Sequence, residues 1–222
     1  MILAGLCLLA TVVIYFISKM IYKHSPKVYL TPLLITPIVL VGLLLLTHIP
    51  FQSYNLGAKW LTDMLQPATI AFAVPLYKYY PLIKKYASEI LLSVLIGALM
   101  GMFSSALIAK LFHLDTDLLD SVIPRSVTTP IAMNVSELIG GIPTITAIVV
   151  IMTGIIGPII GHYIIMFFRI DNDIAKGVLF GTGAHGAGTS KAFEINSISG
   201  TISSVSMILA ALFTLCIAPL VF

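Results

Sequence analysis

The sequence predicts an all-α membrane protein whose helices cross the bilayer several times. Of its 222 residues, 59% are hydrophobic and only 9% are charged, whereas soluble domains carry roughly 25% charged residues. The apolar runs are long and continuous, as transmembrane helices require, and they lack the alternation of β-barrel strands. We expect about seven membrane segments, including interrupted or re-entrant half-helices, with an internal or inverted repeat.

The apolar stretches divide the chain into these expected segments. In order they are residues 1–18, 30–49, 67–77, 89–109, 125–141, 143–168, 181–195 and 201–222. Residues 50–66 are expected to form a linker, with Tyr54 and Trp60 at the membrane interface. The piece at 67–77 is short and has a proline at each end, so it is a candidate third interrupted element. We treat the chain as one membrane domain with a first half, 1–110, and a second half, 111–222, which carries both unusual motifs.

The distribution of charge predicts the orientation. Lysines at 19–27 and at 78–85 are expected on the cytoplasmic side, and the acidic stretch 115–120 is expected outside. The N-terminus is then outside and the C-terminus inside. With this orientation, 125–141 enters and leaves on one side as a re-entrant element.

The first unusual motif, 124–141, has the signals of a half-helix. Thr129 is a suitable N-cap, and Pro130 suits the first helical position. Gly140 and Gly141 are expected to end the helix. About ten residues of helix are too short to cross a hydrocarbon core of about 30 Å.

The second unusual motif, 181–195, has four glycines within eight residues. Each glycine costs about 1 kcal/mol relative to alanine in a helix, so a break is expected within apolar surroundings. Thr189 is the expected N-cap, 190–199 the short helix, and Gly200 its end. An offset of 60 residues then aligns Thr129 with Thr189 and Gly140 with Gly200, which suggests the repeat.

Two half-helix starts at membrane depth favour an anion site. The first N–H groups of a helix lack partners, and its dipole leaves about half a positive charge there. Secondary transporters direct such starts at the anionic group of the substrate. The residues expected to bind a small carboxylate are Arg125, Ser126, Thr128, Thr129, Asn134, His185, Gly186, Gly188, Thr189, Ser190 and Lys191.

Several of these residues have alternative roles. His185 is a candidate substrate donor, proton carrier or packing residue, and an imidazole pKa of about 6.5 suits proton coupling. Arg125 can instead extend towards the membrane surface. Lys191 and Glu194 are spaced to form a local i,i+3 ion pair. Glu137 is a candidate coupling charge or partner of Lys191.

Other classes of function are disfavoured. The ligand spacing of a metal site is missing, as are a nucleophile elbow and a complete phosphate-binding loop. We therefore expect no enzyme activity, no metal and no cofactor, and the net charge of +3 does not indicate nucleic-acid binding. Cys7 and Cys216 are expected to be free apolar residues. His162 is expected to pack within its span.

Both motifs resemble those of the LrgB/CidB family, over essentially the whole chain. The matching stretches are Arg125-Ser-Val-Thr-Thr-Pro-Ile-Ala-Met133 with Gly140-Gly141, and Ala184-His-Gly-Ala-Gly-Thr-Ser-Lys191. The resemblance implies holin- or antiholin-like modulation of murein hydrolases and autolysis. It also implies transport of small monocarboxylates, because plastid relatives are glycolate/glycerate translocators and several bacterial members are linked to pyruvate uptake. A small membrane partner of the LrgA/CidA type is implied as well.

We therefore expect a secondary transporter of small monocarboxylates such as glycolate, glycerate, pyruvate or lactate. The expected setting is the bacterial cytoplasmic membrane, with lipid around a homodimer or higher oligomer, elevator-type movement and proton coupling. The rival hypothesis is a holin-like pore or a membrane regulator of murein hydrolase export and autolysis. A pore should repeat polar residues along its spans, whereas here the polar residues are concentrated in the two motifs.

Overall fold

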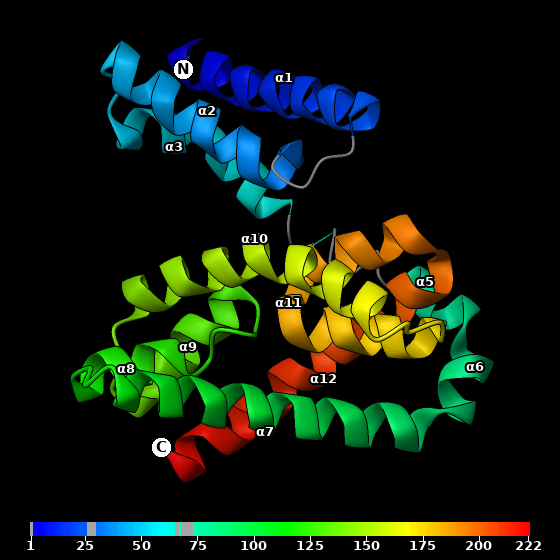
Figure 1. The fold of residues 1–222 in the computed structure, drawn as a ribbon. Helices are drawn as coiled ribbons and strands as arrows, with labels where there is room; N and C mark the ends of the chain where they lie inside the picture. The colour runs from blue at the N-terminus through cyan, green and yellow to red at the C-terminus, as the bar shows by residue number, and fades with distance from the viewer. Residues whose placement is uncertain (1, 26–29, 65–66, 68–72) are drawn as a thin grey trace. The chain divides into compact units, whose positions relative to one another are not determined.

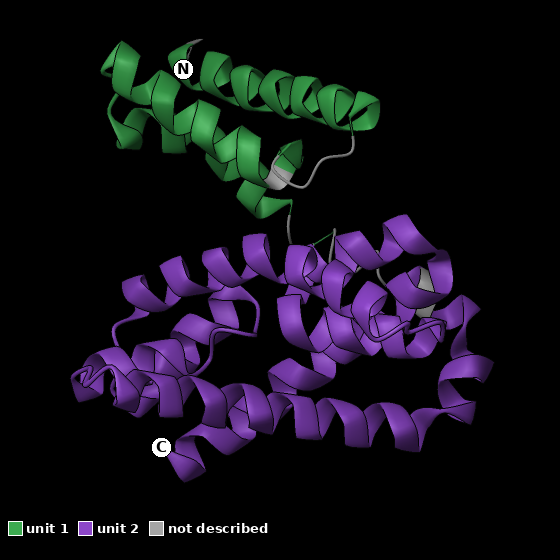
Figure 2. Ribbon diagram, in the orientation of Figure 1, with its two compact units in different colours: residues 1–71 green, residues 72–222 purple. Residues whose placement is uncertain are grey.

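The computed structural model describes residues 2–25, 30–64, 67 and 73–222, and all regular structure among them is helical. The chain forms two compact units, Met1–Ala71 and Phe72–Phe222 (Figure 2). The sequence-based division into halves at residue 110 refers to an expected repeat and not to compact units, so it stays a prediction.

The first unit contains α1 (Ile2–His24), α2 (Pro32–Thr47) and α3 (Phe51–Asp63), with α1 packed against the other two. The stretch expected as a linker at 50–66 forms mainly the helix α3, and its placement at the membrane interface stays a prediction. Gly57 makes the contact between α3 and α1 possible, because a Cβ there would lie 2.9 Å from the carbonyl carbon of Ala4. The hydroxyls of Thr11 and Tyr54 lie 3.3 Å apart across the same interface.

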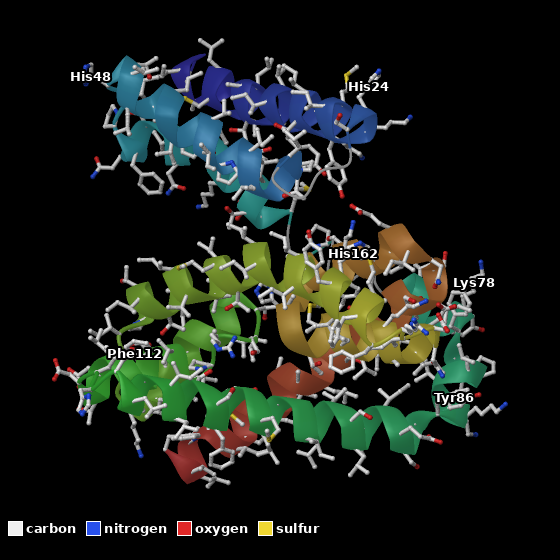
Figure 3. All side chains as sticks on the ribbon, in the orientation of Figure 1. His24, His48, Lys78, Tyr86, Phe112 and His162 are labelled. Atoms are coloured by element: carbon white, nitrogen blue, oxygen red, sulfur yellow. The ribbon has the colours of Figure 1, made fainter. Side chains whose placement is uncertain are left out.

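The second unit begins with α5 (Ala73–Lys78), α6 (Tyr80–Lys85) and α7 (Ala87–Leu111). The predicted span 89–109 is confirmed within α7, whose ends are marked by Tyr86 and Phe112 in Figure 3. Residues 68–72 of the short piece expected at 67–77 lie outside the described residues, and its last part, 73–77, is helical and belongs to α5.

The half-helix expected at the first motif is present. After α8 (Thr116–Val122), the chain turns and forms α9 (Thr129–Ile139), which is followed by α10 (Pro143–Phe167). Gly140 ends α9 with a φ of 96°, a left-handed conformation that favours glycine. The N-cap is Thr128 rather than Thr129, and its side chain makes no capping hydrogen bond.

The second motif is interrupted at a different point from the one predicted. Within α11 (Asp173–Ile195), only Ala184 and His185 leave helical geometry. Thr189 is inside the second part of the helix and is therefore not its N-cap. The next helix, α12 (Ser197–Val221), begins at Asn196, whose side chain accepts a hydrogen bond from Ser199 N at 2.8 Å.

The alignment at an offset of 60 is wrong as a residue-by-residue repeat. Gly140 ends α9, whereas Gly200 is buried inside α12. What recurs is the order of elements: a broken segment followed by a 25-residue helix, first α8–α9 with α10 and then α11 with α12.

Among the described residues, four helices are long and apolar enough to cross a membrane: α1, α7, α10 and α12. The chain is therefore a polytopic helical membrane protein. Reaching the expected total of about seven segments requires the shorter α2, the half-helix α9 and the interrupted α11 to be counted as well.

The second unit is built around α11, which packs between α10 and α12 (Figure 1). Small residues allow this close approach. A Cβ at Gly157 on α10 would lie 2.6 Å from the Cβ of Ala184, and one at Gly181 would lie 2.8 Å from the Cβ of Ser206 on α12. Buried hydroxyls recur along α12, at Ser199, Thr201, Ser203, Ser204, Ser206 and Thr214.

Candidate functional site

The two interruptions converge on the middle of α10. Val127, at the approach to α9, packs with Ala132 in a buried cluster that contains Val150 of α10. The imidazole Nε2 of His185, at the break in α11, lies 3.1 Å from the main-chain oxygen of Val150. Residues about 60 positions apart in the sequence thus lie at the same part of one helix, around Val150.

A small cavity of about 10 Å³ lies between the interruptions and the helices α7 and α12. Its lining is mixed, with hydroxyls from Ser126, Thr182 and Thr214. Gly101 on α7 lies next to this cavity, and a Cβ there would make an ordinary contact with Ser126 Oγ at 3.4 Å. A space of this size holds about one water molecule, so a carboxylate needs a larger site.

A larger groove of about 360 Å³ runs along α10 and α11. It is lined by Arg125, Val149, Met152, Thr153, Ile156, Gly157, Ile160, Gly161, Ile164, Leu179, Gly183 and Ala184. Arg125 is placed towards the Val149 end, because Val127, two residues further along, belongs to the buried cluster that contains Val150. The groove therefore brings the arginine of the first motif to the break in the second.

Arg125 is half-buried and is held by α7. Its Nε donates a hydrogen bond to the buried Ser105 Oγ at 2.6 Å. The salt bridges in the described part of the chain join other residues, so Arg125 has no carboxylate partner there. A guanidinium has five N–H donors in a planar fork, and this one can present further donors to an anion in the groove.

His185 fixes the shape of the break rather than lining the groove. Its backbone has a φ of 40° and a ψ of −131°, which is unusual for any residue other than glycine. Gly154 leaves room for the imidazole, since a Cβ there would lie 3.0 Å from His185 Cε1. Thr189 Oγ1 donates to the His185 main-chain oxygen at 2.9 Å. The side chain and the main chain of His185 are therefore each held by a hydrogen bond.

The predicted local pairing of Lys191 is confirmed. Its Nζ lies 2.7 Å from Glu194 Oε2, and 54% of the Glu194 side chain is exposed. Neither residue lines the groove or the small cavity. Glu137 and Asn134 are likewise exposed on α9, away from both spaces.

The remaining predicted residues take separate places. Thr189 is buried and its hydroxyl lies 3.0 Å from that of Ser203 on α12, while the exposed Ser190 donates to the Gly186 main-chain oxygen. Gly188 packs against Ala184, while the space next to Gly186 is open. The remaining two, Thr128 and Thr129, lie half-buried at the start of α9.

Sequence reasoning missed four hydroxyl residues and the apolar lining from α10. The four are Ser105, Thr153, Thr182 and Thr214. The available signal was a polar residue inside an otherwise apolar span, which in a membrane indicates a partner or a site. His162 also differs from expectation: it is exposed on α10 (Figure 3) and contacts Tyr163 instead of packing in the interior.

These features define a class: helical membrane proteins in which interrupted helices from two parts of the chain meet beside a groove. The LrgB-like family model matches residues 11–222, so the chain belongs to the LrgB-like family.

Named relatives cover nearly the whole chain. The Uncharacterized protein YwbG of Bacillus subtilis (strain 168) is 64% identical over 212 residues, 96% of this chain and 94% of the relative. YxaC of the same organism is 38% identical and covers 99% of this chain and 95% of the relative. The Antiholin-like protein LrgB of Bacillus cereus (strain B4264) is 33% identical and covers 96% of this chain and 93% of the relative. No solved structure matches the chain.

Proposed function

We propose that this protein is a secondary transporter of small monocarboxylates in the bacterial cytoplasmic membrane. The observation that carries the proposal is Arg125, which is half-buried beside an open groove and has no carboxylate partner among the described residues. A charge in such a place is costly unless an anion joins it. A substrate carboxylate supplies that anion and accepts two parallel hydrogen bonds from the guanidinium.

The break in α11 supports the same role. Gly183 and Ala184 line the groove, and the second part of α11 begins immediately beyond His185. N–H groups at a helix start favour negative charge. In this proposal Arg125 binds the carboxylate, Ser126 and the start of α9 shape its surroundings, and His185 holds the break open towards it.

Alternating access completes the transport cycle that we propose. The 151-residue second unit carries both interruptions and is compact by itself, which suits an elevator-type movement of the site-bearing body within a homodimer. Proton coupling through His185 and association with a small LrgA/CidA-type membrane protein belong to this proposal. If the uptake rate does not change between pH 5 and 8, proton coupling through His185 is ruled out.

The second candidate function is a holin-like pore or a membrane regulator of murein hydrolases and autolysis. The name of the Bacillus cereus relatives, antiholin-like protein, favours it. Against a pore, α11 packs closely against α10 and α12, and the cavity between the two motifs is only about 10 Å³.

The deciding experiment is uptake of radiolabelled pyruvate, lactate and glycolate by proteoliposomes of the purified protein. Arg125→Ala and His185→Ala serve as the tested variants. A transporter gives saturable, selective uptake that Arg125→Ala abolishes. Release of all solutes below a size limit from preloaded vesicles would instead support the pore, and the absence of both activities would favour a regulator.

A further inference from the structure

We propose that the groove selects monocarboxylates with an apolar tail of several carbons over small hydroxylated acids such as glycolate and glycerate. This inference rests on the proposed function, because it assigns a substrate class to the same site. It commits the groove to one occupant: the tail of an acid whose carboxylate lies at Arg125.

The size of the groove is the first argument. Its volume is about 360 Å³, within the range of about 300–1,000 Å³ that is usual for pockets holding whole small molecules. A two-carbon acid bound at Arg125 would fill only the end near Val149. The rest of the groove follows α10 as far as Ile164, which leaves space for an extended chain.

The chemistry of the lining is the second argument. Beyond Arg125, most of the side chains that line the groove are apolar, among them Met152, Ile160 and Leu179. The hydroxyl of Thr153 already donates to the Val149 main-chain oxygen at 2.9 Å. A substrate hydroxyl placed further along the groove would lose hydrogen bonds to water and gain few in return, whereas a methylene would lose nothing.

Charge sets the direction of the bound acid. Among the described residues that line the groove, Arg125 alone is charged, so the carboxylate is drawn to that end and the tail follows the isoleucines of α10. Gly183 keeps the floor of the groove free: it is exposed, and a Cβ there would meet no atom within 4 Å. A larger side chain at this position would therefore occupy the groove without disturbing the helix packing.

The test is competition in proteoliposomes against uptake of radiolabelled pyruvate. The competitors share one head group and lengthen by one methylene at a time: 2-oxobutyrate, 2-oxopentanoate and 2-oxohexanoate, with glycerate as the hydroxylated comparison. Burial of each methylene should lower the half-inhibitory concentration by up to about fourfold. Glycerate should compete more weakly than 2-oxobutyrate.

Gly183→Val is the informative variant and Gly42→Val its matched control. A valine at 183 fills the groove, so we expect inhibition to become independent of tail length while pyruvate still competes. Gly42 lies in α2 of the first unit and also has no atom within 4 Å of a Cβ, so its valine variant should keep the wild-type dependence. Ile160→Thr is a second test variant. Ile160 lines the groove from α10, so this change should weaken the dependence of inhibition on tail length.

The outcomes separate the two proposals. The inference is supported if inhibition of the wild type strengthens with each added methylene and Gly183→Val removes this increase. Pyruvate uptake with equal inhibition by every tail length overturns the inference, for example because lipid chains fill the groove, and leaves the proposed function standing. If inhibition still strengthens with tail length in Gly183→Val, the longer acids are partitioning into the bilayer, and this outcome also overturns the inference. Absence of saturable uptake of any acid by the wild type overturns both.

Discussion

The imidazole of His185 lies 3.1 Å from the main-chain oxygen of Val150, and this contact joins the break in α11 to the middle of α10. It coincides with a φ of 40° at His185 itself. Strained backbone persists only where the surrounding structure holds it, and such strain is concentrated at functional sites. The contact to α10 is therefore part of what maintains the break.

Replacing His185 by glycine and by alanine should separate the strain from the contact. Both variants lose the imidazole, but only glycine adopts the positive φ without cost. We expect His185→Gly to be more stable than His185→Ala by about 1 kcal/mol. Unfolding followed by circular dichroism in mild detergent measures the difference, and equal stability of the two variants would contradict the strained geometry.

Arg125→Gln should lower transport efficiency by about 10- to 100-fold. Hydrogen bonds to a charged group contribute roughly 1.5–3 kcal/mol, and glutamine keeps a shorter polar side chain without the charge. The loss should be mainly in KM, as measured by initial rates of uptake at varied substrate concentration. Arg169→Gln, an exposed site just beyond the end of α10, is the control and should retain wild-type kinetics.

Ser105→Ala should reduce transport through Arg125. The Ser105 hydroxyl accepts the Arg125 Nε–H at 2.6 Å, and losing that bond frees the guanidinium to leave the groove. We expect a loss of about 3- to 10-fold, with partial recovery in Ser105→Thr. In the Arg125→Gln background, Ser105→Ala should cost nothing further; additive losses would show that Ser105 acts independently of the arginine.

Gly181→Ala should destabilise the packing of α11 against α12. The new Cβ would lie 2.8 Å from the Cβ of Ser206, and overpacking of this kind costs about 1–3 kcal/mol. Gly183→Ala is the matched control two residues away, where open space surrounds the added methyl. Thermal unfolding in detergent should show a lower Tm for Gly181→Ala and an unchanged or higher Tm for Gly183→Ala.

Asp120→Asn should stabilise the protein at neutral pH. Burial, and then the nearby charge of Asp117, raise the pKa of Asp120 on α8 above its ordinary value. Stability from such a carboxyl is present below its unfolded pKa of about 3.9 and is lost as the pH rises through the folded pKa. The Tm of Asp120→Asn should therefore exceed that of the wild type at pH 7, and the two should converge near pH 4.

The helices were largely predictable because lipid imposes simple rules on their length and composition. The spans at 89–109 and 143–168 and the half-helix ended by Gly140 follow from apolar runs, proline and glycine. The break in α11 was misplaced because Thr189 has the residue type of an N-cap but bonds inside the helix to His185. Nothing local in the sequence distinguishes these two uses of a threonine hydroxyl.

The site was predictable only as far as its two motifs. Arg125 and the break near His185 were found from charge and glycine content. In the structure, Arg125 and the residues before the break line the same groove, and His185 contacts Val150 on α10. The contribution of α10 was missed because its lining residues, such as Ile160, have the composition of any membrane helix. Lys191 was included among the candidate substrate-binding residues because of its positive charge. In the structure its ammonium group forms an ion pair with Glu194 on the same helix.

The hydroxyls between α11 and α12 bear on how the protein enters the bilayer. Ser199 Oγ donates to the Asp173 main-chain oxygen at 3.1 Å, and the Thr189 and Ser203 hydroxyls are 3.0 Å apart. Alone in hydrocarbon, a glycine-rich helix with a disrupted backbone would expose polar groups, some of which bond to α12 in the folded protein. We therefore expect the ribosome-bound translocon to retain α11 until α12 has been synthesised, and to release the two together as one hairpin.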